Sequence, residues 1–171
     1  MTKGKSGYIQ CGETIYDYFL NEPRMVWLTA AEAVSSGDVL VLDASADTQA
    51  KATTTEGAYG PVMVTAKPDA TASITIPSGT TGWFQAWGRC AQVNLMSAAT
   101  RGDWLVTSTT SLKAKPVTSA SLPPTGAFGL ALTEGSTPEA HLFGGVVNSS
   151  VAIAAAAPSY TFAGQLWVDT A

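Results

Sequence analysis

Short apolar runs alternate with glycine, proline and small polar residues along most of the chain. Runs of about four to eight residues that are rich in valine, isoleucine and aromatics, and are bounded by such turn residues, are typical of β-strands. The sequence predicts strands at Met25–Leu28, Val39–Leu42, Ala58–Ala66, Ile74–Ile76, Gly82–Cys90, Trp104–Ser108, Gly126–Leu132 and Ala140–Val147, with Tyr160–Val168 as a candidate for one more.

The segments between these strands are interpreted as connections. Asp43–Gly57 is expected to form a hairpin or an exposed loop, and Thr109–Thr125 a loop. Few segments carry a helical period, although Thr29–Val34 could hold one helical turn. We therefore expect an all-β domain that forms a small β-barrel or a sandwich.

The two faces of the predicted strand Gly82–Cys90 differ in chemistry, because residues two positions apart lie on the same side of a strand. The side expected to face the core carries Phe84, Ala86, Gly88 and Cys90. The opposite side carries Trp83, Gln85, Trp87 and Arg89. Tryptophan and arginine are enriched where proteins bind one another, so this side is a candidate contact surface. The alternative is that both indoles cover an intramolecular core, since a tryptophan buries a large area.

One pattern occurs twice. Gly37–Val41 and Gly102–Val106 both read Gly-Asp-x-Leu-Val, and they stand 65 positions apart (102 − 37). An apolar triplet precedes each copy and a pair of glycines follows it: Val26–Leu28 with Gly57 and Gly60, and Val93–Leu95 with Gly126 and Gly129. Two copies at this distance indicate a duplicated β-unit that forms two halves of one barrel or sandwich.

The domain of predicted strands covers residues 25–147, and a segment flanks it on each side. Residues 1–24 are interpreted as an N-terminal arm, and residues 148–171 as a C-terminal extension. The arm contains Tyr8, Tyr16, Tyr18 and Phe19, which are candidate interface residues because exposed aromatics normally find an apolar surface. Such an arm either lies on a neighbouring subunit or covers its own barrel.

The composition of the chain favours a protein that assembles over one that remains a free monomer. Charged residues make up 13% of the chain, about half of the usual quarter, and 46% of the residues are apolar. A surface this poor in charge is expected to be covered by copies of the chain or by a larger structure. The net charge of −4 and nine scattered Lys and Arg residues argue against nucleic acid as a partner.

Targeting and redox signals are also weak. No apolar core of a secretory signal follows Met1, and the longest apolar run, Val151–Ala157, is too short to span a membrane. We expect no membrane partner, and synthesis in the cytoplasm. Cys11 and Cys90 are therefore expected to be reduced.

Candidate chemistry is sparse, and we expect no catalytic, cofactor-binding or metal-binding residues. His141 is the single histidine and cannot build a zinc site alone. The chain has no Cys-x-x-Cys and no glycine-rich phosphate loop, and its acidic residues are scattered. Arg101-Gly102-Asp103 spells an integrin tripeptide, but its last two residues match Gly37-Asp38. This match favours a turn, in which the Asp103 side chain accepts hydrogen bonds from backbone N–H groups.

The order of these motifs resembles a known family. Gly-Trp-Phe-Gln-x-Trp-Gly at 82–88 is followed by Arg-Gly-Asp-x-Leu-Val at 101–106, Thr-Gly-x-x-Gly-x-Ala-Leu at 125–132 and an apolar strand at 140–147. This order is similar to that of the capsid decoration, or cement, proteins of tailed bacteriophages, and the similarity covers about residues 25–147.

The resemblance implies a small β-barrel or tulip-like domain that assembles, often as a homotrimer, on the outer surface of the virion capsid. It implies a structural protein that stabilises the shell by bridging subunits of the major capsid protein. The two extensions leave open a component of a phage fibre or tail. A carbohydrate-binding β module, with Trp83 and Trp87 as its platform, is the alternative from a different class.

Overall fold

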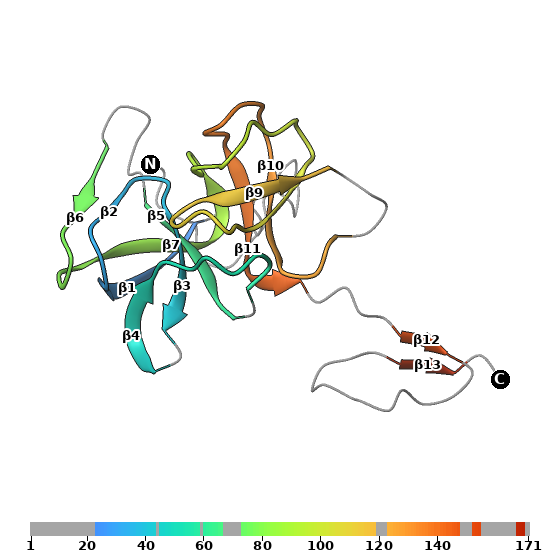
Figure 1. Cartoon of the computed structure of the whole chain (residues 1–171), viewed down its shortest axis with the longest axis horizontal. Coiled ribbons are helices and arrows are strands. Elements are labelled where there is room, and N and C mark those ends of the chain that lie inside the picture. Colours follow the sequence, from blue (N-terminus) through green and yellow to red (C-terminus); the bar gives the residue numbers. More distant parts are fainter. Residues whose placement is uncertain are drawn as a thin grey trace, which may run out of the picture.

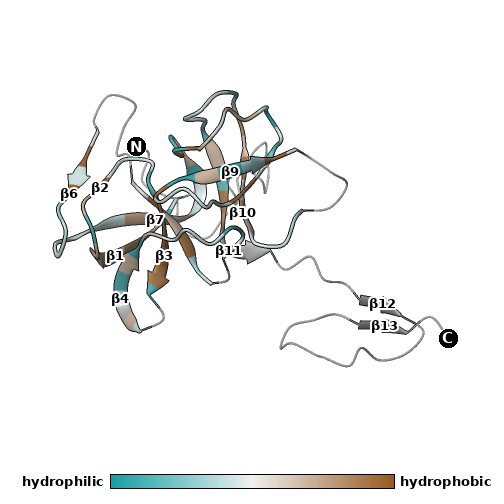
Figure 2. Cartoon of the chain, in the orientation of Figure 1, coloured by the Kyte–Doolittle hydropathy of each residue, from teal (hydrophilic) through white to brown (hydrophobic). Residues whose placement is uncertain are grey.

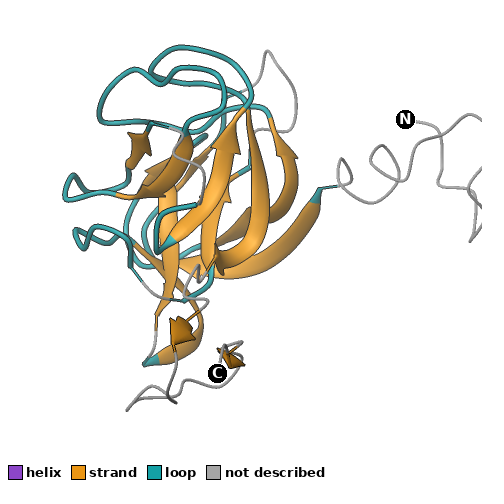
Figure 3. Cartoon of the chain, turned by 90° about the vertical axis from the view of Figure 1, so that its right-hand side faces the viewer, coloured by secondary structure: helices purple, strands orange, loops and turns teal. Residues whose placement is uncertain are grey.

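The computed structural model describes residues 23–43, 45–58, 60–66, 73–118, 123–147, 152–154 and 167–169. In these ranges the chain forms strands and loops and no helix (Figure 3). The strands are β1 (Arg24–Ala30), β2 (Val34–Ser35), β3 (Val39–Asp43), β4 (Ala46–Lys51), β5 (Val62–Thr65), β6 (Thr75–Ile76), β7 (Thr81–Cys90), β8 (Trp104–Thr107), β9 (Ala114–Val117), β10 (Ala127–Ala131), β11 (Ala140–Val147), β12 (Ala152–Ala154) and β13 (Trp167–Asp169). The predicted all-β class is confirmed.

Five strands close into a barrel in the order β1-β4-β3-β5-β7, because β1 pairs with both β4 and β7 (Figure 1). The pairing of β1 with β7 is antiparallel and long, whereas its pairing with β4 is parallel and limited to Thr29↔Gln49 and Ala30↔Ala50. Large side chains fill the interior, chiefly Leu40, Met63 and Phe84.

The sheet continues beyond this barrel through β7. The C-terminal half of β7 pairs with β11, and the order then runs β11-β10-β8-β9. These strands enclose a second core, which contains Leu105, Phe128 and Leu142. In the four-stranded part of the sheet, β9 is the edge strand.

Strands β3 and β5 form a wall between the two cores. Leu40 and Met63 point into the first core, while their neighbours on the strands, Val39, Val41, Val62 and Val64, belong to the second. Both faces of these strands are therefore buried, which explains why they read as continuous apolar runs and not as alternating ones. Figure 2 shows the apolar colouring of β3 at the centre of the molecule.

The predicted duplication is visible in the strand pairing. The first unit runs from β1 to β7 with the order β1-β4-β3-β5-β7, and the second runs from β7 to β11 with the order β9-β8-β10-β11-β7. In each unit the first strand pairs antiparallel with the last. Each unit also has a parallel contact near the end of its first strand: Ala30↔Ala50 at the end of β1, and Leu95↔Ala114 shortly after β7. Strand β7 is thus the last strand of one unit and the first strand of the next.

The two Gly-Asp turns have the same hydrogen bonds. Asp38 Oδ2 accepts from the Ser35 N–H at 2.8 Å, and Asp103 Oδ2 accepts from the Thr100 N–H at 2.8 Å. The glycine before each aspartate has a positive φ, 86° at Gly37 and 92° at Gly102, a region that L side chains rarely adopt. The prediction that Asp103 accepts from a backbone N–H is confirmed, and the tripeptide has a structural explanation.

The structure corrects the finer alignment of the copies. The glycine pairs stand 69 positions apart (126 − 57). In the strand pairing, Val41 lies opposite Val62 and Val106 lies opposite Ala127. Val62 therefore corresponds to Ala127, which is 65 positions further along the chain (127 − 62). The apolar triplets stand 67 positions apart (93 − 26). The parallel contacts instead match Ala30 with Leu95, 65 positions apart (95 − 30), and their partners Ala50 and Ala114 are 64 apart (114 − 50). Neither the glycines nor the triplets are therefore equivalent positions.

Two further predictions are wrong in detail. The segment Thr29–Val34 belongs to the end of β1, a bend and the start of β2, because Ala30 is paired with β4. The segment Thr109–Thr125, expected to be a loop, contains β9, which pairs antiparallel with β8. Asp43–Gly57 forms the hairpin that was one of its two expected states, since β4 pairs with β3.

Candidate functional site

The outer face of β1 and β7 carries the largest exposed aromatic surface of the described chain. Trp27 and Trp83 lie directly opposite each other in the register of the two strands. Their exposed fractions are 53% and 51%. The rings meet edge to face, with centroids 4.8 Å apart and an interplanar angle of 64°, the offset geometry that aromatic pairs prefer.

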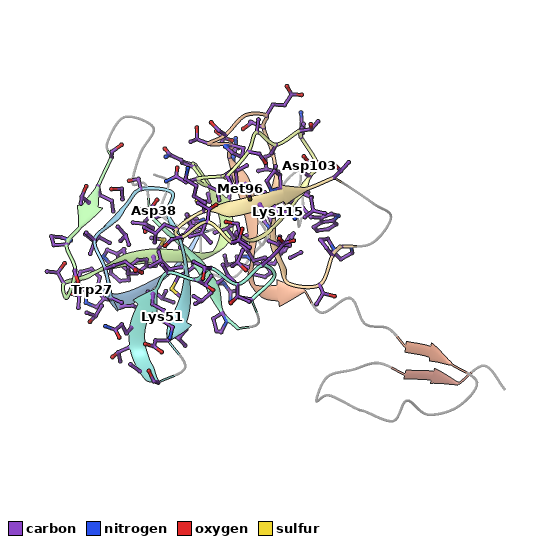
Figure 4. All side chains as sticks on the ribbon, viewed as in Figure 1. Trp27, Asp38, Lys51, Met96, Asp103 and Lys115 are labelled. Atoms are coloured by element: carbon purple, nitrogen blue, oxygen red, sulfur yellow. The ribbon has the colours of Figure 1, made fainter. Side chains whose placement is uncertain are left out.

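A groove of about 620 Å³ lies beside this pair. We call it the tryptophan groove, and it is lined by Pro23, Met25, Trp27, Ala66, Ile74, Thr75, Ile76, Gly82, Trp83 and Gln85. Its volume is in the range of sites that bind a peptide segment or a small ligand. In Figure 4, Trp27 lies at the left-hand edge of the molecule, away from Met96 and Asp103.

The wall of the groove is rigid. Phe84, between Trp83 and Gln85 on β7, points into the first core and is fully buried. Gln85 is 6% exposed, and its Nε2 donates to the Trp87 carbonyl at 3.0 Å and to the Arg89 carbonyl at 2.9 Å. Because its amide is held by two hydrogen bonds, Gln85 presents a fixed side chain to the groove. A strand of a closed barrel therefore positions the exposed indoles.

The predicted contact face of β7 divides into two parts. Trp83 lies in the tryptophan groove, as described above. Trp87 is half-buried: the Arg24 guanidinium lies 5.8 Å from its ring centroid, and the His141 ring is 6.1 Å away. Arg89 pairs with Glu139, its Nε lying 3.1 Å from Glu139 Oε2. Trp87 and Arg89 thus make contacts within the chain.

These contacts bear on carbohydrate binding. A sugar ring stacks on an indole whose face is open to solvent, and Arg24 covers one face of Trp87. Trp27 and Trp83 are inclined to each other and do not form one flat platform. The geometry therefore favours an apolar segment over a sugar as the occupant of this surface.

Sequence reasoning missed Trp27 and Met25. The alternation in Met25-Val26-Trp27-Leu28 was a signal, because it puts Met25 and Trp27 on one side of the strand. What the sequence lacked was the pairing of β1 with β7, which places Trp27 beside Trp83. The other predicted contact residues, Tyr8, Tyr16, Tyr18 and Phe19, lie outside the described residues.

Two buried ionisable side chains of the described part, His141 and Cys90, have shifted pKa values. No cluster of three His, Cys, Asp or Glu side chains is found there. His141 is 6% exposed and lies between Trp87 and Phe143, and its burial lowers its pKa, so the imidazole is neutral at neutral pH. Cys90 is buried, and this burial raises its pKa to about 11, which keeps the thiol protonated and unreactive.

No protein-family model and no curated protein sequence matches the chain. Among solved structures, one match is the N base of the head fiber gp8.5 of bacteriophage phi29, with 18% identity and a TM-score of 0.44. The match covers 74% of this chain and 99% of that one. A likeness at this level supports no conclusion about function. In the described residues no helix is long and apolar enough to cross a membrane.

Proposed function

We propose that this chain is a non-enzymatic structural protein of a bacteriophage virion, which assembles with copies of itself and binds the outer surface of the capsid. The pattern of turns and strands that resembles capsid decoration proteins supports the proposal, and so does the low charge of the chain. In this role the protein bridges subunits of the major capsid protein.

One observation carries the proposal, namely the concentration of exposed apolar side chains in one place. The large hydrophobic side chains that are exposed in the described part are Met25, Trp27, Trp83 and Met96, and all but Met96 line the tryptophan groove. Contiguous apolar surface on a soluble protein generally marks a site of association. Because a closed barrel holds these side chains in place, binding them costs little conformational entropy.

Binding of this kind stabilises a shell by mass action. A ligand that binds only the assembled state adds RT ln(1 + [L]/Kd), about 2.7 kcal/mol per site when its free concentration is a hundred times Kd. Many such sites on one shell multiply the effect, so no single contact needs to be strong. This mechanism requires no catalytic residue.

The experiment uses empty capsids assembled from the cognate major capsid protein. The chain is expected to sediment with the capsids and to raise the temperature at which they disassemble, measured by light scattering. Trp27→Ala/Trp83→Ala is expected to weaken both effects, whereas Met96→Ala, which removes an exposed apolar side chain away from the groove, is the matched control. Absence of binding together with an unchanged disassembly temperature would rule out the capsid role.

Electron microscopy of the same particles separates capsid decoration from the fibre alternative. Density spread over the faces of the shell is expected for a decoration protein. Density confined to projecting spikes or to the tail would assign the chain to a fibre or tail instead. A glycan-binding screen with the Trp87→Ala variant tests the carbohydrate alternative, for which Trp87-dependent binding would be required.

A further inference from the structure

The tryptophan groove has no occupant among the described residues. Trp27 and Trp83, which are about half exposed, line it together with Ile74 and Ile76 of the segment around β6. An apolar groove next to a sheet suits an extended peptide whose alternate side chains enter it. The chain itself contains a segment of this chemistry.

That segment precedes Pro23, which lines the groove. Residues 1–22 lie outside the described part, and when extended they can span about 70 Å, enough to reach a neighbouring molecule. The stretch Ile15–Leu20 reads Ile-Tyr-Asp-Tyr-Phe-Leu, so all but one of its residues are apolar or aromatic. Large aromatic side chains of this kind supply most of the binding energy in protein interfaces.

Charge supports the same pairing. Residues 13–22 contain Glu13, Asp17 and Glu22 and no lysine or arginine. Arg24, at the start of β1, is exposed and holds its guanidinium over Trp87, next to the groove. An acidic segment that enters the groove therefore meets a cation beside it.

The direction of β1 indicates which copy supplies the segment. Arg24 lies opposite Trp87, and Trp27 and Trp83 lie further along the strand toward Thr81. The chain before Arg24 therefore leaves at the end of β1 that is away from the tryptophan pair. Glu22 precedes Pro23, and a residue before proline is held extended, which disfavours a tight reversal at this point. To lie along the groove of its own copy, the segment before Pro23, which lines one end of that groove, would have to reverse its direction.

We propose that the tryptophan groove of one copy binds the stretch Ile15–Leu20 of a second copy, so that the chains associate by exchanging N-terminal arms. This proposal rests on the proposed function and deepens it: the tryptophan groove, which the capsid experiment also perturbs, takes the arm of a second copy, and the assembled copies bind the capsid. Each copy gives one arm and receives one, so the contact is head to tail and closes into a ring when the rotation between copies allows it.

Complementation between two variants tests this exchange. The first variant lacks residues 2–22 and keeps the groove. The second keeps the arm and carries Trp27→Ala/Trp83→Ala. Light scattering after size-exclusion chromatography is expected to find an oligomer for the full chain and a monomer for each variant alone. An equimolar mixture is expected to form a one-to-one complex, because one variant supplies the groove and the other supplies the arm.

Controls separate loss of binding from loss of folding. Urea unfolding of each variant checks that the barrel is intact, and Met96→Ala is expected to leave the oligomer unchanged. A synthetic peptide of residues 13–22 is expected to bind the arm-deleted chain and to shift its tryptophan emission to shorter wavelength. Its affinity is expected to fall at least tenfold with Trp27→Ala.

Three results would overturn the exchange. These are a monomeric full chain, an oligomer that survives deletion of the arm, and folded variants that do not combine. A monomeric full chain whose groove is protected would mean that the arm binds in its own copy. Capsid binding is measured separately with the same variants, so the arm exchange and the capsid role can fail independently.

Discussion

The two Gly-Asp turns provide a matched pair of substitutions, Gly37→Ala and Gly102→Ala. Both glycines have φ near 90°, so an alanine at either site is strained by about 1–2 kcal/mol. The surroundings differ. A Cβ at Gly37 would lie 2.9 Å from Asn94 Oδ1 and 2.9 Å from Gln92 Cγ, whereas a Cβ at Gly102 meets nothing within 4 Å.

The larger cost at Gly37 follows from the bonds that these two side chains make. Asn94 Nδ2 donates to Asp38 Oδ1 at 2.7 Å, and Gln92 Nε2 donates to the Ser36 carbonyl at 3.2 Å. A hydrogen bond to a charged group contributes about 1.5–3 kcal/mol and a neutral one about 0.5–1.5 kcal/mol. If the new methyl displaces both amides, Gly37→Ala loses about 2–4 kcal/mol more than Gly102→Ala.

Urea unfolding measures this difference, since both variants are expected to shift the midpoint with little change in slope. In an Asn94→Ala background the gap between the two glycine variants is expected to shrink, because part of the displaced bonding is already gone. Equal destabilisation of the two variants would refute the reasoning. It would mean that the segment after β7 does not cover the Gly37 turn.

Other positions give further tests. Asp43 Oδ1 accepts from Lys51 Nζ at 2.8 Å and also from the backbone N–H and the hydroxyl of Ser45, and these bonds lower the Asp43 pKa to about 2. The ionised Asp43 therefore stabilises the fold fully above its unfolded pKa of about 3.9, and this stabilisation is lost as pH falls toward 2. Lys51→Met should flatten the pH dependence of the free energy of unfolding in this range. An unchanged pH profile would contradict this. In a Cys11→Ser background, Cys90 should react with a thiol reagent only after urea is added, and rapid reaction of the folded chain would mean that its core is open. Phe84→Ala should cost about 3–5 kcal/mol in urea unfolding, and a loss below about 1 kcal/mol would contradict the burial of this ring.

Features set by local chemistry were predictable from the sequence. The turns at Gly37 and Gly102 depend on a glycine that adopts positive φ and on an aspartate that accepts from a nearby N–H. Both requirements are visible in two adjacent residues, so the duplication could be detected. The buried faces of β3 and β5 were likewise readable, because strands covered on both sides carry apolar residues at every position.

Features set by strand pairing were not predictable. Strand β9 contains Lys115 and Pro116, which suggested a loop, but an edge strand tolerates a proline that cannot donate. The tryptophan groove depends on Trp27 and Trp83, which stand 56 positions apart (83 − 27) and become neighbours only through the pairing of β1 with β7. Periodicity assigns a face to each side chain but does not name the strand beside it.

The sharing of β7 also bears on how such a chain can lengthen in evolution. A duplication in which the last strand of one copy serves as the first strand of the next adds four main strands per copy and needs no linker. By the same rule β11 is the first strand of any further copy. That copy would pack against Trp104, Val106 and Leu130. In the second unit these residues hold the pairing positions that Val39, Val41 and Val64 hold in the first. Two copies are the shortest array in which one copy forms a wall of the other's core.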